Sequence, residues 1–503
     1  MAAALDPARI PVLIAQGEVT DRPADPADAR EPVVLMADAL RDAEADAGAA
    51  LIAAIDSIEL VGIVGYPYRD PVGLLCEKLG IAPARAVNAS MGGETPVRLV
   101  HEAALRIAAG TSQVAAIVGG EAQNALNKAR KAGIELGWTP PPPPGEAFRA
   151  HFDRMTRPAS RAVGVFAPVH IYPLYENAWT AAHGLTPYAG QQASAALWAR
   201  FAAVAANNPK AWMQRAPGAE EIGTHSAANR PVAFPYAKLN VANPAVNQGG
   251  AVVVASLAWA RAAGIAEERL IHIWGGAAAN EPNDYLLRDS YAHSTAMRAV
   301  LARAVEIAGG DAAAFDLAEL YSCFPIVPKM ALEAMPLRAD VEPTVAGGLT
   351  FFGGPLNNYM THGICAMMRG LRSGTGELGL VYGQGGVVSK HHALVLGRAP
   401  APEPLSPDVS VQAAADAARG EVPLVTEDYA GPATVETWTV LYAPDGAVER
   451  GVVLARTPAG ERLIAQVLPE DEDVIARLTD WNASAVGLHG EVAAGPEGTL
   501  RWK

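Results

Sequence analysis

The sequence predicts an α/β protein in which one structural unit is duplicated, followed by a small β-rich domain. Half of the 503 residues are hydrophobic and 48 are glycine, a composition that suits close packing of helices against sheets. A glycine-bearing loop, a helix, a buried strand and a Gly-Gly pair follow one another twice, at 86–121 and 350–386. Such repetition indicates a duplicated fold. After about Pro400 the sequence changes to short segments that alternate like strands.

The first copy begins with the loop "AVNASMGGE" and continues as a helix. Apolar residues then recur at three- or four-residue steps, which predicts a helix over about 95–109. Gly110 follows as a C-terminal stop. The run "QVAAIV" at 113–118 is short enough for a strand that is buried on both faces, and Gly119-Gly120 is expected to end it.

The second copy repeats this order with a helix predicted from about 362 to 371, the strand "LGLVY" and the pair Gly385-Gly386. Each copy is preceded by one further strand and helix. Two buried strand–helix–strand units can also resemble one another by chance. Duplication and coincidence therefore both stay open on this pattern alone.

A long, less regular region separates the first buried strand from the apolar run at 251–257. Five consecutive prolines at 140–144 predict a stiff extended segment within it. The region also holds the densest basic clusters of an acidic chain. These clusters indicate either an insertion that binds phosphate groups or helix faces that are exposed to solvent. The basic residues singled out in them are Lys128, Arg130, Lys131 and Arg154.

The C-terminal part has a pattern of its own. "APAPEPLSP" predicts a linker, and "TVETWTVLY" and "GVVLAR" alternate like strands bounded by Pro-Asp-Gly and Pro-Ala-Gly turns. One short helix is predicted at about 471–478. Residues 413–503 are therefore expected to form a separate small β-rich domain, built as a partly open barrel.

Charge and cysteine content argue against several classes of protein. The formal net charge of -14 repels phosphate backbones and so argues against nucleic-acid binding. Three cysteines lie far apart in the sequence, which indicates a reducing, cytosolic compartment. No signal peptide or membrane span is expected, since the most apolar run, 251–260, is about half the length that crosses a bilayer. No Cys/His cluster has metal-ligand spacing, so no metal is predicted.

Four short segments carry a resemblance to the thiolase superfamily. "NASMGG", "YSCF", "GGPLNNYMT" and "GQGG" occur in the order of its four catalytic loops, and residues 8–400 resemble its sterol-carrier-protein-type branch. Relatives called thiolase-like proteins type 1, often labelled acetyl-CoA acetyltransferases, also carry an extra C-terminal domain. The resemblance implies a duplicated thiolase fold of two βαβαβαββ halves, layered α-β-α-β-α, with an OB-like small domain.

The resemblance also implies the domain boundaries and the ligand. Residues 1–272 correspond to the N-terminal thiolase half, with a loop-domain insertion at about 123–240, and 273–400 correspond to the C-terminal half. A linker at 401–412 leads to the additional domain at 413–503. The implied substrate or ligand is a coenzyme A thioester, and no permanently bound cofactor is expected.

All four loops depart from the superfamily at positions that carry chemistry. Ser90 stands where the nucleophilic cysteine is implied, and Tyr321 replaces an Asn or a His. Tyr359 begins the dipeptide that replaces a Gly-His pair, and His362 follows it closely. Gly383 takes the place of the second cysteine, whereas the framework glycines are retained.

These replacements favour chemistry without an acyl-enzyme. A serine hydroxyl needs a general base within hydrogen-bond reach, which His362 or His391 would have to supply; otherwise Ser90 only closes a turn. The phenols of Tyr321 and Tyr359 can move a proton or hold an oxyanion. They suit aldol-type formation or cleavage of a C–C bond next to a thioester, unless they merely fill the space of the lost side chains.

Three functions follow from the resemblance: an enzyme of acyl-CoA and lipid metabolism, an inactive acyl-CoA or lipid-thioester binding protein, and a scaffold subunit that needs a partner. The tyrosines and the histidine favour the enzyme. Cysteine-less relatives include retro-aldolases that work with an OB-fold partner subunit, so such a partner is one expectation. The chain is expected to be a cytoplasmic monomer or homodimer. Lys128, Arg130, Lys131 and Arg154 are expected to contact the CoA phosphates.

Overall fold

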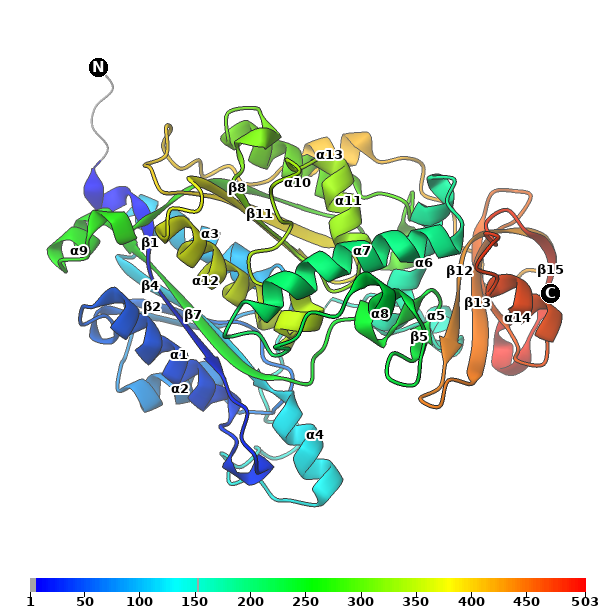
Figure 1. Ribbon diagram of the computed structural model, residues 1–503, viewed down its shortest axis with the longest axis horizontal. Coiled ribbons are helices and arrows are strands. Elements are labelled where there is room, and N and C mark those ends of the chain that lie inside the picture. The colour runs from blue at the N-terminus through cyan, green and yellow to red at the C-terminus, as the bar shows by residue number, and fades with distance from the viewer. Residues whose placement is uncertain (1–5, 152) are drawn as a thin grey trace.

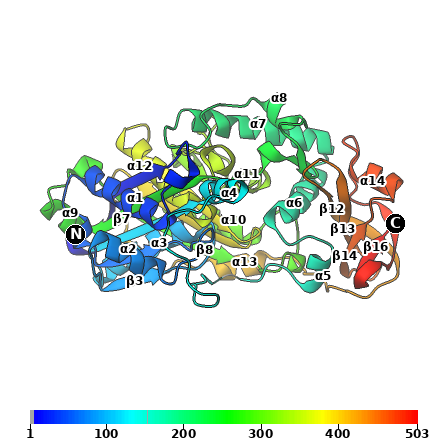
Figure 2. The same cartoon turned by 90° about the horizontal axis from the view of Figure 1, so that it is seen from below.

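A computed structural model describes residues 6–151 and 153–503 of the chain. It is elongated, with a large α/β body and a small β-domain at one end of the long axis (Figures 1 and 2). The body contains a nine-stranded sheet in the order β3-β2-β4-β7-β1-β8-β11-β10-β9. Its strands are β1 (Pro11–Thr20), β2 (Ser57–Leu60), β3 (Arg85–Asn88), β4 (Val114–Ala122), β7 (Asn247–Ser256), β8 (Ile271–Asn280), β9 (Leu317–Leu320), β10 (Leu378–Gly385) and β11 (Lys390–Gly397).

The sheet consists of two equivalent halves. In the first, β2 and β4 are parallel and are followed by antiparallel β7 and β1. In the second, β9 and β10 are parallel and are followed by antiparallel β11 and β8. Among the described residues, the strand pairing between the two halves is that of β1 with β8, at Val12–His272 and Leu13–Ile271. The predicted duplication is thereby confirmed.

Helices form three layers around the two halves. Helices α1 (Pro32–Ala47) and α2 (Pro71–Leu79) cover the outer face of the first half, and α10 (Thr295–Ile307) covers that of the second. Helices α3 (Thr95–Ala109) and α12 (Tyr359–Arg372) lie against each other between the halves and contact strands of both. The layers are α-β-α-β-α, as the thiolase resemblance implies.

The central helix α3 has the predicted bounds, and its end has a clear physical cause. Its apolar face is completely buried between the two halves of the sheet. Gly110 adopts a left-handed conformation with φ of 73°, and its N–H bonds to the carbonyls of Arg106 and Ile107. Glycine reaches this conformation without steric cost, so the helix can end there.

Two predicted boundaries are wrong. Strand β4 continues through Gly119-Gly120 to Ala122, because both glycines pair with Gly250 and Gly249 of β7. A Cβ on Gly119 would lie 2.2 Å from the Asn358 side chain, so this strand needs glycine for close packing and not for a turn. Helix α12 begins at Tyr359, three residues before the predicted start.

Helices are the main regular elements of the insertion between β4 and β7. Its prolines 140–144 lie in neither a helix nor a strand. Helix α11 (Ile326–Ala334), which belongs to the body, packs against the insertion. The insertion contains α4 (Gln123–Ala132), α5 (Pro158–Ala162), α6 (Pro168–Ala182), α7 (Pro187–Ala206), α8 (Ala219–Gly223), β5 (Pro231–Ala233) and β6 (Tyr236–Ala237).

The C-terminal sheet closes into a five-stranded barrel, because β12 pairs with β13 as well as with β15. In chain order the strands lie 1-2-3-5-4-1, the third and fifth are parallel, and α14 (Glu472–Leu478) connects the third to the fourth. This is the arrangement of a five-stranded Greek-key barrel of the OB type. The strands are β12 (Gly431–Tyr442), β13 (Val448–Arg456), β14 (Arg462–Val467), β15 (His489–Ala494) and β16 (Leu500–Trp502).

The barrel is attached to the body through the insertion. Strand β5 extends the barrel sheet by pairing Ala233 with Leu441, and β12 packs along α6. The side chain of Asn177 on α6 donates to the carbonyls of Phe234 and Trp438.

No helix in the described part of the chain is long and apolar enough to cross a membrane. The apolar run 251–260 lies in buried β7 and the start of α9 (Leu257–Ala262).

Candidate active site

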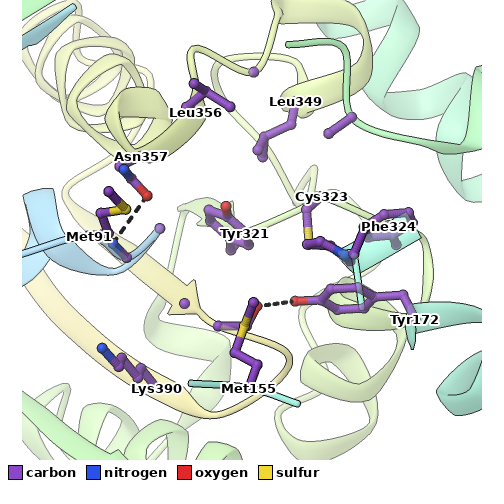
Figure 3. A pocket seen from close by; sticks show the side chains of 18 of the residues that line it. Met91, Met155, Tyr172, Tyr321, Cys323, Phe324, Leu349, Leu356, Asn357 and Lys390 are labelled. Carbon is purple, nitrogen blue, oxygen red and sulfur yellow. Dashed lines mark hydrogen bonds between the residues drawn. The ribbon is translucent and has the colours of Figure 1, made fainter. Parts of the chain in front are cut away.

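A cavity of about 520 Å³ lies where the two halves of the body and the insertion meet. Its wall is mostly apolar and includes Met155, Phe324, Leu349 and Leu356 (Figure 3). The polar groups that reach it are few and come from different segments. They belong to Tyr172, Tyr321, Cys323, Asn283, Asn357, Ser389, Asp153 and Lys390.

The loop between β3 and α3 forms one wall of this cavity through Met91, Gly92 and Gly93. Asn357 holds the loop in place, since it accepts a hydrogen bond from the Gly92 N–H at 3.1 Å and donates to the Gly62 carbonyl at 2.8 Å. The loop before α3 and the loop before α12, one from each half, are therefore brought together.

Ser90 is not among the residues that line the cavity. Its hydroxyl accepts a hydrogen bond from the Arg98 guanidinium at 3.1 Å, and Arg98 also pairs with Glu102 at 2.7 Å. Neither His362 nor His391 is a hydrogen-bond partner of Ser90. A serine activated by a histidine base is not assembled in this geometry.

Tyr321 directly follows β9 and lines the cavity with 7% of its surface exposed. Its hydroxyl has no hydrogen-bond partner among the described residues. A Cβ on Gly93 would lie 2.3 Å from this hydroxyl oxygen, so only glycine permits the approach. Burial, Cys323 and Glu94 raise the pKa of Tyr321 well above its usual value. The phenol is therefore a neutral donor directed to the cavity.

Tyr359 lies beside Tyr321, with ring centroids 6.3 Å apart in an edge-to-face arrangement, but it does not line the cavity. Its hydroxyl donates to Glu319 at 2.7 Å and accepts from the Gly348 N–H at 2.8 Å. Burial raises the pKa of Glu319 to about 7 against the lowering effect of this bond. Tyr359 is thus satisfied inside the protein.

The two predicted histidines also lie in the interior and not on the cavity. His362 donates from Nδ1 to Glu18 at 2.7 Å, and Glu18 is further paired with Arg369. His391 is hydrogen-bonded to the hydroxyl of Tyr382 at 2.7 Å. Burial lowers the pKa of His391 to about 4, so this imidazole is neutral at physiological pH.

Tyr172 is a cavity residue that the sequence pattern did not indicate, because it comes from helix α6 of the irregular insertion. Its hydroxyl donates to the side chain of Gln384 at 2.8 Å and lies 3.1 Å from the Gly386 carbonyl. Its ring stacks on Phe324, with centroids 4.4 Å apart. Tyr172 therefore joins the insertion to the glycine-rich loop after β10.

Cys323 reaches the cavity but is not a ready nucleophile. Burial raises the pKa of its thiol to about 12. The reactive form of a cysteine is the thiolate, which is nearly absent at neutral pH when the pKa is this high.

Lys390 is the one cation among the described residues that line the cavity. Its ammonium group pairs with Asp153 at 2.6 Å and so links β11 to the insertion. A lone lysine at the start of a strand carries no motif, so the sequence does not single out Lys390.

The four predicted phosphate-binding residues are exposed and lie outside the cavity wall. Lys128, Arg130 and Lys131 lie on α4, whose first residue, Gln123, approaches Gly65 next to the cavity residue Val64. Helix α4 thus starts beside the cavity and carries its basic residues on its later turns. Arg154 follows the cavity residue Asp153 in a segment that forms neither a helix nor a strand. The described residues contain no group of three side chains that could hold a metal ion.

Comparison with known proteins gives one family and several similar folds. Residues 411–497 match the family described as "Thiolase-like protein type 1 additional C-terminal domain". A monomeric SCP2-thiolase-like protein type 1 (STLP1) from Mycobacterium smegmatis is 29% identical, with a TM-score of 0.82, over 99% of this chain and 100% of that chain. No curated protein sequence matches the chain significantly.

Two further structures share the fold of the body. The Ltp2-ChsH2(DUF35) aldolase is 20% identical, with a TM-score of 0.58, over 77% of this chain and 97% of that chain. Human mitochondrial 3-ketoacyl-CoA thiolase in complex with CoA is 13% identical, with a TM-score of 0.56, over 78% and 98% of the respective chains. At these identities the likeness extends to the fold alone.

Proposed function

Because the chain is recognised as a thiolase-like protein of type 1, we propose that it acts on acyl-CoA thioesters and makes or breaks a C–C bond by aldol-type chemistry. The observation that carries this proposal is the neutral phenol of Tyr321, which faces an apolar cavity at the junction of the two halves. The similar folds include a thiolase with bound CoA and an aldolase, which supports both the ligand and the reaction class.

The absence of a ready thiolate supports a route without an acyl-enzyme. Ser90 is held by Arg98 outside the cavity wall, and the thiol of Cys323 is protonated at neutral pH. A thiolase reaction needs a nucleophile that forms an acyl-enzyme, whereas aldol cleavage needs only proton transfers at oxygen and carbon.

In the cleavage direction, the substrate is a 3-hydroxyacyl-CoA. Its 3-hydroxyl loses a proton, the C2–C3 bond breaks, and a carbonyl compound and the enolate of the shortened acyl-CoA result. Protonation of the enolate carbon then completes the reaction without an oxidant or a second substrate. Tyr321 is the group proposed to exchange the proton with the 3-hydroxyl, because its hydroxyl faces the cavity without another partner.

The rest of the thioester is proposed to run from the cavity over the surface along α4. The apolar cavity suits the acyl chain. Residues of a helix rise about 1.5 Å each, so Lys131 lies on the order of 12 Å along α4 from Gln123 beside the cavity. The pantetheine arm of CoA separates its thioester from its phosphates. We propose Lys128, Arg130, Lys131 and Arg154 for those phosphates.

The C-terminal barrel is proposed to take the place of a separate partner subunit. The aldolase of similar fold is an assembly of Ltp2 with ChsH2(DUF35). Here an OB-type barrel is part of the same chain and packs against α6, which carries the cavity residue Tyr172. We therefore propose a protein that is active as a monomer. The three cysteines are free and buried, which supports a reducing, cytoplasmic location.

The proposal is tested by mass spectrometry of a panel of 3-hydroxyacyl-CoAs and 3-oxoacyl-CoAs after incubation with the purified protein, with and without free CoA. We expect cleavage of a 3-hydroxyacyl-CoA without added CoA. CoA-dependent cleavage of a 3-oxoacyl-CoA would instead mean thiolysis. Binding of the thioesters without turnover would favour the acyl-CoA binding protein.

Tyr321→Phe removes only the hydroxyl and should lower turnover by about 10²–10⁴-fold, the usual contribution of a proton-transfer group. Binding of CoA should be unchanged, as measured by calorimetry. Tyr66→Phe is the matched control, because that hydroxyl bonds to the Thr139 carbonyl away from the cavity wall. Full turnover by Tyr321→Phe would exclude the tyrosine mechanism.

A further inference from the structure

A buried carboxyl group lies directly behind the glycine wall of the cavity. Glu94 follows Gly92 and Gly93, and only 5% of the residue is exposed. One of its carboxyl oxygens, Oε2, is completely buried and has no hydrogen-bond partner among the described residues. An unpaired buried carboxyl oxygen costs free energy, so its presence in a well-packed interior calls for a function.

The glycines around Glu94 show how closely this group approaches the cavity. A Cβ on Gly92 would lie 2.2 Å from Oε2, and a Cβ on Gly385 would lie 1.7 Å from it. Both glycines line the cavity. The wall between Glu94 and the cavity is therefore backbone without side chains, contributed by the loop before α3 and by the end of β10.

The same glycine wall brings Glu94 close to Tyr321. A Cβ on Gly93 would lie 2.3 Å from the Tyr321 hydroxyl, and a Cβ on Gly385 would lie 3.2 Å from the Gly93 nitrogen as well as against Oε2. The negative charge of Glu94 also contributes to the raised pKa of Tyr321. The carboxyl and the phenol thus belong to one small region, although they come from different halves of the molecule.

We propose that Glu94 holds and returns the proton that Tyr321 exchanges with the substrate. This inference rests on the proposed aldol function and adds the group that completes the proton transfer. A neutral phenol can accept a proton from the 3-hydroxyl only if it passes its own proton on. The Glu94 carboxylate lies behind the same glycine wall and can receive that proton through one bridging water molecule.

Tyr321 and Glu94 together account for every proton that is transferred in the reaction. The substrate O–H breaks as a new O–H forms on Tyr321, and the original Tyr321 O–H breaks as an O–H forms on Glu94. The alkoxide then expels the enolate by cleavage of C2–C3. The proton on Glu94 returns through Tyr321 to the enolate carbon, so that both residues end in their starting forms.

The surroundings of Glu94 suit a group that changes its protonation state. Burial raises the pKa of its carboxyl, and the charges of Lys390 and Arg98 oppose that effect. Asp153, which pairs with Lys390, raises the pKa further. The groups that face Glu94 are therefore Lys390 on β11, Arg98 on α3, Asp153 in the insertion and Tyr321 after β9.

The first test does not depend on turnover. Infrared spectra of the wild-type protein between pH 4 and 9 should contain a protonated-carboxyl band that is absent in Glu94→Gln. In Tyr321→Phe this band should titrate at a pH higher by on the order of one unit, because the carboxylate loses the phenol proposed to donate to it through water. Glu102→Gln is the matched control, since Glu102 pairs with the same Arg98 but its side chain is 40% exposed. A titration that is identical in wild type and Tyr321→Phe would overturn the proposal.

The second test uses the pH profile of 3-hydroxyacyl-CoA cleavage. Turnover by the wild type should rise with pH as Glu94 loses its proton, and Glu94→Gln should lose this limb together with about 10²–10⁴-fold of kcat. Glu94→Asp should restore part of both. An unchanged profile in Glu94→Gln would overturn the role of Glu94 but leave the aldol function standing. If the wild type cleaves no thioester, the aldol function fails, whereas a band that shifts in Tyr321→Phe still supports the pairing of Glu94 with Tyr321.

Discussion

At the scale of single residues, the predicted catalytic set separates into one cavity residue and several interior ones. Tyr321 could be found because its loop has the spacing of the resembled family. Tyr359, His362 and His391 have equally suggestive positions in the sequence, yet each is buried with a partner of its own. Burial depends on contacts between distant segments, such as His362 with Glu18, and the sequence pattern carries no sign of them.

Glu94 shows the opposite case of a residue that the sequence does not single out. It follows two glycines in the nucleophile loop, where an acidic residue has no counterpart in the resembled motif. Its significance comes from Gly385, which is close to it only in the folded chain. An orphaned buried oxygen is a property of three-dimensional packing, so no single-sequence signal could have found it.

The pair of Tyr359 and Glu319 gives a prediction about stability. Burial raises the pKa of Glu319 to about 7 in the folded state, from a usual value of 4.5. The folded state then binds the proton more tightly than the unfolded chain. This contribution to stability is complete below pH 4.5 and is lost as pH rises through 7, with a limit of about 3 kcal/mol.

Glu319→Gln should therefore flatten the fall in the free energy of unfolding between pH 4.5 and 7. Urea denaturation of wild type and variant across this range measures the difference. Tyr359→Phe should cost about 1–3 kcal/mol, because Glu319 and the Gly348 N–H both lose a partner. If the free energy of unfolding of Glu319→Gln had the same pH dependence as that of the wild type, this explanation would be contradicted.

At the scale of elements, periodicity predicted the helix at 95–109 with its correct bounds because the whole apolar face of α3 is buried. The prediction that the strand ends at Gly119-Gly120 is wrong. Glycine is common where strands end, but here the two glycines allow the sheet to pack closely. The insertion was the least predictable part. Its helices lie around the cavity and the barrel, and their apolar residues are distributed over several partners.

Gly249 tests the close packing between strand β7 and helix α1. A Cβ at this position would lie 2.6 Å from the backbone oxygen of Leu35, which a helix cannot easily move. Gly249→Ala should lower the free energy of unfolding by about 1–3 kcal/mol or more, measured by urea denaturation. Gly137→Ala is the control, because a Cβ there meets no atom within 4 Å and the backbone conformation is ordinary. Equal stability of the two variants would refute the packing argument.

At the scale of the whole molecule, the barrel and the cavity are joined by a chain of buried polar contacts. Arg462 of β14 is completely buried, pairs with Glu436 at 2.7 Å and donates to the carbonyls of Leu286 and Arg288. Arg288 in turn donates to the carbonyl of Val387, which follows the cavity residue Gly386. The resemblance predicted that a small β-rich domain is present, but only the fold shows where it is attached.

This connection predicts that damage to the barrel interface reaches the active site. Arg462→Met takes one of its two arginine partners from Glu436 and leaves the carbonyls of Leu286 and Arg288 without their donor, so it should cost about 1–3 kcal/mol of stability. Hydrogen exchange should become faster both at 284–291 and at the loop 385–389 that lines the cavity. The double variant Arg462→Met/Glu436→Gln also removes the carboxylate that Arg462 balanced and should recover part of the stability. It should not recover the exchange protection at 385–389, because the bonds to Leu286 and Arg288 are still missing. Faster exchange confined to the barrel in both variants would mean that the domain is only attached to the body and does not support the cavity.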